Sequence, residues 1–266
     1  MISRRARSTT AALCLFLAGW APEASAQDTF NWNTDSNGSW HDGFNWDQGT
    51  APNGVSDVVV ISRPAANPTV SYTALSGATL VESLVSEEAI VLTGGSLEVL
   101  TNAEFIGSFT LMGGTLKGGM IVATSGIEVG SSQNSRVDGI TLDGNLELTG
   151  SSDYLGVLNG LTLNGTANLS GYSSRLDFAG TQSFGASSGQ TATVEMGEYN
   201  TKLQVTDGGT LTLESTVTVV GEGTVTGSGT GDAIINNGLI HANLNNANLI
   251  LSPETFTNTG TLRASN

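Results

Sequence analysis

The sequence predicts an all-β protein built as a β-solenoid, and three observations point to that class. Short apolar-polar alternations recur about every twenty residues, as in Leu92-Thr-Gly-Gly-Ser-Leu97 and Leu111-Met-Gly-Gly-Thr-Leu116. Some of these intervals are well defined: the pair Thr141-Leu142 returns as Thr162-Leu163 after 21 positions. Gly and Asn interrupt each phrase, and both residues accept positive φ at low cost. A fixed period with alternation inside each unit is typical of short strands that stack coil upon coil.

The first 26 residues are typical of a cleaved secretory signal peptide. Three arginines among the first seven residues precede an apolar run from Ala11 to Trp20, and Ala24-Ser-Ala26 supplies small residues for cleavage. This run is about half of the ~20 apolar residues that cross a bilayer, so we do not expect an anchor. We therefore expect a secreted or cell-surface protein, exported across the inner membrane, whose mature chain begins at Gln27.

Cleavage makes the chain more acidic and leaves it without cysteine. The full sequence has 9 basic and 24 acidic residues, and the mature part keeps 6 and 23, a net charge of −17. So acidic a chain repels phosphate backbones and anionic lipid heads, which argues against nucleic acid as a partner and against membrane insertion of the mature segment. Cys14, the sole cysteine, lies inside the signal peptide, so disulfides and cysteine-based metal sites are excluded from the mature chain.

Residues 27–54 are predicted to form an N-terminal aromatic cap. Trp32, Trp40 and Trp46 crowd this segment among Asn, Asp and Gly. A solenoid without a cap exposes its apolar interior and an unpaired strand edge, so its first coil needs a cover. Broad indole faces also stack on sugars, and glycan stacking by these three tryptophans stays open as the alternative.

Residues 55–266 are predicted to form the solenoid, which we expect to continue beyond Asn266 because the last residues read as a coil cut short. The stretch 172–200 departs from the period through its aromatic residues, which predicts a longer loop or a corner packed by aromatics. Asparagines near the C-terminal end suit side-chain ladders between coils. They are Asn236, Asn237, Asn243, Asn245, Asn246, Asn248 and Asn258.

Several segments of the sequence resemble a known family. Phe30-Asn-Trp32, Gly38-Ser-Trp40 and Asn45-Trp46, followed by Asp57-Val-Val-Val-Ile61, resemble the opening of autotransporter-type β-helical passenger regions. Similar openings occur in bacterial exported proteins with a PEP-CTERM sorting signal. The resemblance covers nearly the whole mature chain and implies a right-handed parallel β-helix on or outside a bacterial envelope, often described as adhesin-like. It implies surface glycans or other envelope proteins as partners and no catalytic residue.

Parallel β-helices also include polysaccharide lyases and glycoside hydrolases, so a carbohydrate-active enzyme or a glycan-binding module is the alternative function. The basic residues of the mature chain are scattered singly, and only Arg136 lies near a carboxylate pair, Asp138 and Asp143. His41 and His241 are 200 residues apart and cannot share a site within a monomer. The calcium-binding repeat Gly-Gly-x-Gly-x-Asp is absent. We therefore expect no catalytic residue, metal site or cofactor, and no enzyme activity.

Overall fold

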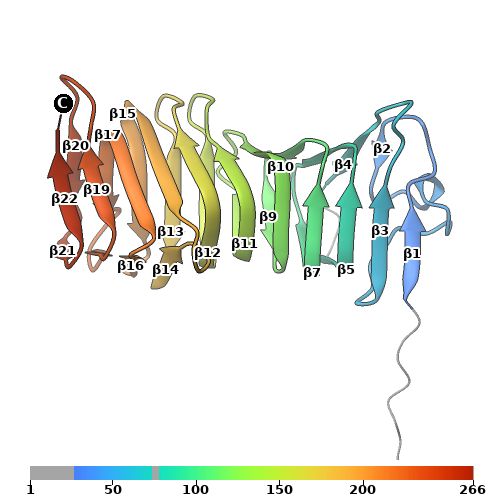
Figure 1. The fold of residues 1–266 in the computed structure, drawn as a ribbon. Coiled ribbons are helices and arrows are strands. Elements are labelled where there is room, and N and C mark those ends of the chain that lie inside the picture. Colours follow the sequence, from blue (N-terminus) through green and yellow to red (C-terminus); the bar gives the residue numbers. More distant parts are fainter. Residues whose placement is uncertain (1–26, 74–77, 266) are drawn as a thin grey trace, which may run out of the picture.

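The computed structural model describes residues 27–73 and 78–265, so the predicted signal peptide lies outside the described residues. The described residues form 22 strands and one short 3-10 helix, η1 (Gly43–Asn45). All ladders between these strands are parallel, and they stack coil on coil into a β-solenoid of about nine turns. Figure 1 shows the stack running from β1 at one end to β22 at the other. The predicted fold class is confirmed.

The strands form one 22-stranded sheet that bends around the solenoid, and its three parallel ladders are called faces A, B and C. Face A contains β1 (Asp28–Asn31), β3 (Asp57–Ile61), β14 (Gln182–Gly185), β16 (Thr210–Leu213), β18 (Ala233–Asn236) and β21 (Thr255–Asn258). Face B contains β2 (Gly38–Ser39), β4 (Thr69–Tyr72), β6 (Ala89–Leu92), β8 (Phe109–Leu111), β19 (Leu239–Ala242) and β22 (Thr261–Ala264). Face C contains β9 (Gly114–Lys117), β13 (Arg175–Ala179) and β20 (Leu249–Ser252).

The longer strands turn a corner and so contribute to more than one face. They are β5 (Ala78–Ser86), β7 (Ser96–Phe105), β10 (Met120–Val129), β11 (Ser135–Glu147), β12 (Tyr154–Leu169), β15 (Ala192–Thr206) and β17 (Val217–Gly227). Their ladders shift register at the corners, for example between Asp138 and Ile140 where β11 pairs with β12. The coils therefore bend where Gly or Asn stands, as the sequence pattern predicts.

Alternate side chains of every face point inward and build one apolar core. On face A a column of inward residues passes through successive coils: Leu84, Ala103, Ile121, Leu142 and Leu163. Each of these side chains is at most 3% exposed. Full burial of an aliphatic side chain contributes about 1.5–3 kcal/mol, so the repeated column is the main source of stability. Outward positions of the same strands carry the polar residues, which makes each face amphipathic.

The segment expected as a cap is itself the first coil of the solenoid. β1 pairs in register with β3, and β2 pairs with β4, so both strands extend the ladders of faces A and B. The indole rings fill the interior of this coil, and Trp32 forms an isolated antiparallel bridge with Trp46. The first coil therefore covers the apolar interior of the coils that follow.

Two finer sequence expectations hold in part. The stretch 172–200, where a longer loop or corner is predicted, does contain a connection over residues 186–191, but β13, β14 and the start of β15 occupy most of it. Phe178 and Phe184 are fully buried core residues with ring centroids 5.2 Å apart. The asparagine ladder is confirmed for one pair, since Asn236 Nδ2 donates to Asn258 Oδ1 at 2.7 Å. The asparagines between residues 243 and 248 lie instead on the exposed connection from β19 to β20.

Surface grooves as candidate functional sites

The three tryptophans proposed for glycan stacking are buried. Trp32, Trp40 and Trp46 are at most 2% exposed, and the Trp46 ring meets the rings of Trp32 and Trp40 edge to face, with centroids 5.1 Å apart in both pairs. Trp46 Nε1 donates to the Trp40 carbonyl at 2.7 Å. A sugar needs a ring face open to solvent, and none of these rings offers one in this arrangement. Their geometry is that of a packed cap.

The carboxylate pair considered for catalysis is split between two faces. Asp138 lies on face C in register with Lys117 and Leu158, whereas Asp143 lies on face A in register with Asn164. Asp138 Oδ1 accepts a hydrogen bond of 2.6 Å from Asn159 Nδ2, a contact between neighbouring coils. The two carboxylates therefore lie on different faces, on either side of the corner in β11.

The two histidines lie near opposite ends of the described stack and make local contacts. His41, just after β2, places Nε2 2.9 Å from the Thr73 carbonyl, and His241 in β19 places Nε2 2.8 Å from Ser265 Oγ. Among the described residues no group of three or more His, Cys, Asp or Glu side chains is placed to hold a metal ion. Neither histidine is part of a cluster with a nucleophile and an acid.

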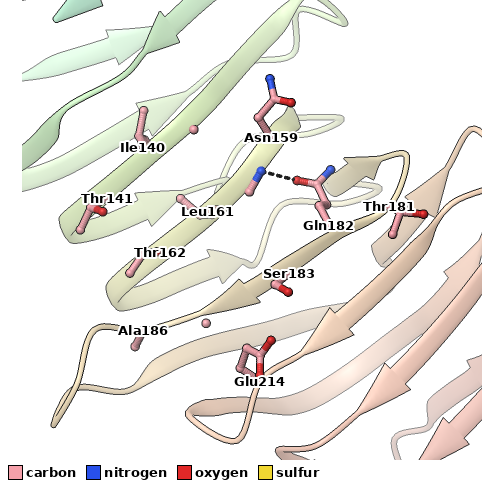
Figure 2. Close-up of a pocket in the computed structure, with 13 residues that line it drawn as sticks. Ile140, Thr141, Asn159, Leu161, Thr162, Thr181, Gln182, Ser183, Ala186 and Glu214 are labelled. Atoms are coloured by element: carbon pink, nitrogen blue, oxygen red, sulfur yellow. Dashed lines mark hydrogen bonds between the residues drawn. The ribbon is translucent and has the colours of Figure 1, made fainter. Parts of the chain in front are cut away.

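A groove of about 560 Å³ lies on the outside of face A, over β11, β12 and β14, and we call it the face A groove. Figure 2 shows Thr141, Thr162, Ser183 and Glu214 arranged along it, one coil after another. The groove exists because the ladder between β12 and β14 is short, with only Leu161–Phe184 and Thr162–Gly185 in register. The strands separate beyond these pairs, which leaves a hollow.

Gln182 stabilises the irregular backbone beside this hollow. Its Oε1 accepts from the Gly160 amide at 2.8 Å, and its Nε2 donates to the carbonyls of Val157 and Ala179 at 2.9 and 2.8 Å. Figure 2 shows the first of these bonds as a dashed line. Asn159 and Gly160, with φ of 54° and 91°, form the corner that Gln182 holds. The side chain of Gln182 is thus committed to the backbone and leaves hydroxyls as the main polar groups of the groove.

The lining of the face A groove suits hydrogen bonding more than acid-base chemistry. It contains one carboxylate, Glu214, and otherwise threonine, serine, amide, glycine and aliphatic residues. Glycoside hydrolysis by the usual mechanism needs two carboxyl groups about 5–9.5 Å apart across the scissile bond. The described residues that line this groove do not supply a second one.

Most buried carboxylates of the solenoid have a structural role. Asp57, Asp153 and Asp232 accept hydrogen bonds from backbone amides of tight turns, and Glu88 accepts one from the Arg63 amide. Asp177 is equally buried, at 6% exposed, but differs because its Oδ1 has no hydrogen-bond partner among the described residues. Its Oδ2 lies 3.8 Å from Arg175 Nη2. Burial raises the pKa of the Asp177 carboxyl from 3.8 to about 6, while Arg175 and then Lys202 oppose the shift.

We expect the Asp177→Asn variant to change the pH dependence of stability. Because the pKa of Asp177 is raised in the folded protein, its ionisation destabilises the fold as pH rises from about 4 to 6, and the full penalty, at most about 3 kcal/mol, is present above that window. Asp177→Asn should therefore melt above the wild type at pH 7 and close to it at pH 4. Melting temperatures across this range test the prediction, with the exposed Asp143→Asn as control. Parallel curves for wild type and Asp177→Asn would contradict it.

The structure also gathers basic residues that look scattered in the sequence. Arg136, Arg175 and Lys202 lie on the outer side of face C, with Arg175 in register with Lys202 and with Tyr154. Three similar sequence segments indicate the column that holds Arg175 and Lys202. They are Tyr154-Leu-Gly-Val157, Arg175-Leu-Asp-Phe178 and Lys202-Leu-Gln-Val205. Their first positions stack in successive coils, and aligning them places the side chains in one column.

Comparison with protein-family profiles, with curated proteins and with solved structures gives no significant match. No helix in the described part of the chain is long and apolar enough to cross a bilayer. The fold and the surface chemistry are therefore the basis for the functional argument.

Proposed function

We propose that this chain is an exported, adhesin-like β-helix of the passenger type, which presents its long polar faces to ligands at the cell surface or outside the cell and has no catalytic activity. The observation that carries the proposal is the division of roles along every coil. Inward positions supply an apolar core, and outward positions supply registered rows of hydroxyl and amide groups, as in the face A groove.

This arrangement favours contact with an extended polymer over turnover of a small substrate. Neighbouring coils repeat about every 4.8 Å, so equivalent side chains form regular rows along the axis. A glycan chain is likewise a repeating array of hydroxyl groups, and its partners on the protein are neutral donors and acceptors. Thr141 and Thr162, in register on adjacent strands of face A, are an example of such a row.

The test has one arm for location and one for chemistry. Intact cells that express the full gene product should be labelled by an antibody against the solenoid, and external protease should remove the label. The purified protein should leave a panel of neutral and acidic polysaccharides uncleaved, as measured by new reducing ends and by the absorbance of unsaturated ends. Reproducible turnover that Asp138→Ala abolishes would overturn the non-catalytic proposal in favour of a carbohydrate-active β-helix, and label found only inside cells would overturn the proposed location.

A further inference from the structure

We infer that face C carries a binding site for an acidic saccharide, centred on Arg175 and Lys202. The inference deepens the proposed function, on which it rests, by naming the charge of the ligand and the place where it binds. The site is a hollow of about 580 Å³ at the edge of face C, beside the loops that lead from face B to face C. We call it the face C groove, and its lining includes Gln133, Ser152, Tyr172, Arg175, Asn200 and Lys202.

The two cations of the face C groove come from adjacent coils. Arg175 in β13 and Lys202 in β15 are in register, so their Cα atoms are neighbours across one ladder. Strands in such a ladder are about 4.8 Å apart, which places two positive side chains within reach of one anionic group. Within the described part of the chain, the Lys202 ammonium group has neither an ion pair nor a hydrogen bond. An unpaired cation of this kind is available to a ligand.

Arg175 is held in a fixed orientation. Its Nη2 donates to Gln133 Oε1 at 2.9 Å, and its guanidinium carbon lies 5.1 Å from the centre of the Tyr154 ring. These contacts use one nitrogen and one face of the planar group. The remaining guanidinium N–H groups form no hydrogen bond with another described residue, and guanidinium edges pair well with carboxylates and sulfates.

Two other basic side chains of the described chain have acidic partners close by. Lys117 Nζ lies 3.1 Å from Glu98 Oε2, and Arg63 Nε lies 3.7 Å from Asp35 Oδ1. The lining of the face C groove contains no Asp or Glu, although the mature sequence has 23 acidic residues against 6 basic ones. Asp177, whose Oδ2 lies 3.8 Å from Arg175 Nη2, is buried and is not part of this lining. The groove is thus an exception to the acidic character of the protein.

The neutral lining distinguishes an acidic saccharide from a nucleic acid. Ser152 and Asn200 supply hydrogen-bonding groups for sugar hydroxyls, and Tyr172, which is 59% exposed, presents a ring on which a sugar can pack. A polyphosphate chain carries a charge on every unit and would meet the acidic surface on both sides of the groove. A glycan with carboxylates spaced among neutral sugars places its charges on Arg175 and Lys202 and its hydroxyls elsewhere.

Affinity electrophoresis of the purified exported protein in gels containing polygalacturonate tests the inference, with neutral galactan as the reference polymer. Polygalacturonate should retard the wild-type protein and galactan should not. Lys202→Gln should weaken retardation about tenfold, the usual effect of losing one charged hydrogen bond, while Lys202→Arg retains it. The matched control is Lys117→Gln, which removes a cation of the same face outside the groove and should change binding less than about twofold.

A second variant acts in the opposite direction and separates binding from folding. Asp177→Asn removes the carboxylate beside the two cations, so it should strengthen retardation by polygalacturonate at pH 7. A general loss of folding cannot strengthen binding, and melting temperatures of all variants accompany the gels.

Four results would overturn the inference: no retardation of the wild type by either polygalacturonate or heparin, equal retardation by galactan, equal retardation of the wild type and Lys202→Gln, or retardation by long-chain polyphosphate alone. Heparin, a sulfated glycan, is tested in parallel. Retardation by heparin alone still supports an acidic saccharide, and it identifies the anionic group of the ligand as a sulfate in place of a carboxylate. Failure of the site leaves surface labelling of the cells unaffected. Cleavage of bound polygalacturonate, in contrast, would contradict the proposed non-catalytic function and leave the site intact.

Discussion

The Trp46→Ala variant is expected to lose about 3–5 kcal/mol of stability, the usual cost of truncating a buried tryptophan to alanine. Trp46 is 2% exposed and packs edge to face against both Trp32 and Trp40. The substitution also removes the donor to the Trp40 carbonyl. Loss of the first coil exposes the strand edge of β3 and β4, so we also expect aggregation of the variant.

Thermal unfolding followed by circular dichroism measures the effect, and a loss of this size corresponds to a melting temperature lower by roughly 6–20 °C. Phe44→Ala is the matched control, because Phe44 lies two positions away and is 92% exposed. If both variants have the melting temperature of the wild type, and Trp46→Ala no longer binds a glycan array that the wild type binds, then the tryptophans form a lectin-like surface and the cap assignment is wrong.

The course of the solenoid was predictable where the coils have equal length. Thr141-Leu142 and Thr162-Leu163, which are 21 positions apart in the sequence, pair in register in adjacent strands of face A. Leucine at the second position of each phrase points inward and is buried. A constant repeat fixes which residues stack, and alternation fixes which side chains enter the core, so local pattern determines both the fold and its register here.

The period fails where the coils lengthen. Phe184 and Leu213 are paired on face A although they are 29 positions apart, so the stretch that contains Phe178 and Phe184 looks irregular in the sequence. The extra residues lie in the connections between strands, and the strands themselves keep the inward position for an aromatic ring. Burial of these phenylalanines depends on the space inside the coil. That space is a property of the stacked structure and cannot be inferred from one short sequence segment.

The face C groove was hidden for the same reason. Arg175 and Lys202 are 27 positions apart, longer than the repeat read from the regular coils, so the sequence presents them as isolated cations. Asp177 shows a second limit, because its burial depends on neighbours from adjacent coils. Gly156 and Gln204 flank it in the ladder. Charge clustering in a solenoid depends on register, and register requires the lengths of all the connections.

The Gly221→Ala variant is expected to lose about 2–6 kcal/mol, because two separate penalties combine at one position. Gly221 in β17 has φ of 107°, which L side chains rarely adopt. A Cβ atom added there would lie 1.9 Å from the Met196 carbonyl oxygen in β15, the strand of the preceding coil. The backbone of one coil or the other must move, which disrupts the ladder between β15 and β17.

Alanine variants of two other glycines separate the penalty of backbone strain from the penalty of close contact. Gly189 has φ of 81° and no atom within 4 Å of the point that a Cβ would occupy, so Gly189→Ala should lose only the ~1–2 kcal/mol of a strained backbone. Gly229 has neither a positive φ nor a close neighbour, and Gly229→Ala should lie within about 0.5 kcal/mol of the wild type. Chemical denaturation of the three variants should rank them in this order. If Gly221→Ala is no less stable than Gly189→Ala, then close contact between coils does not limit this position, and the spacing between β15 and β17 is wider than the structure has it.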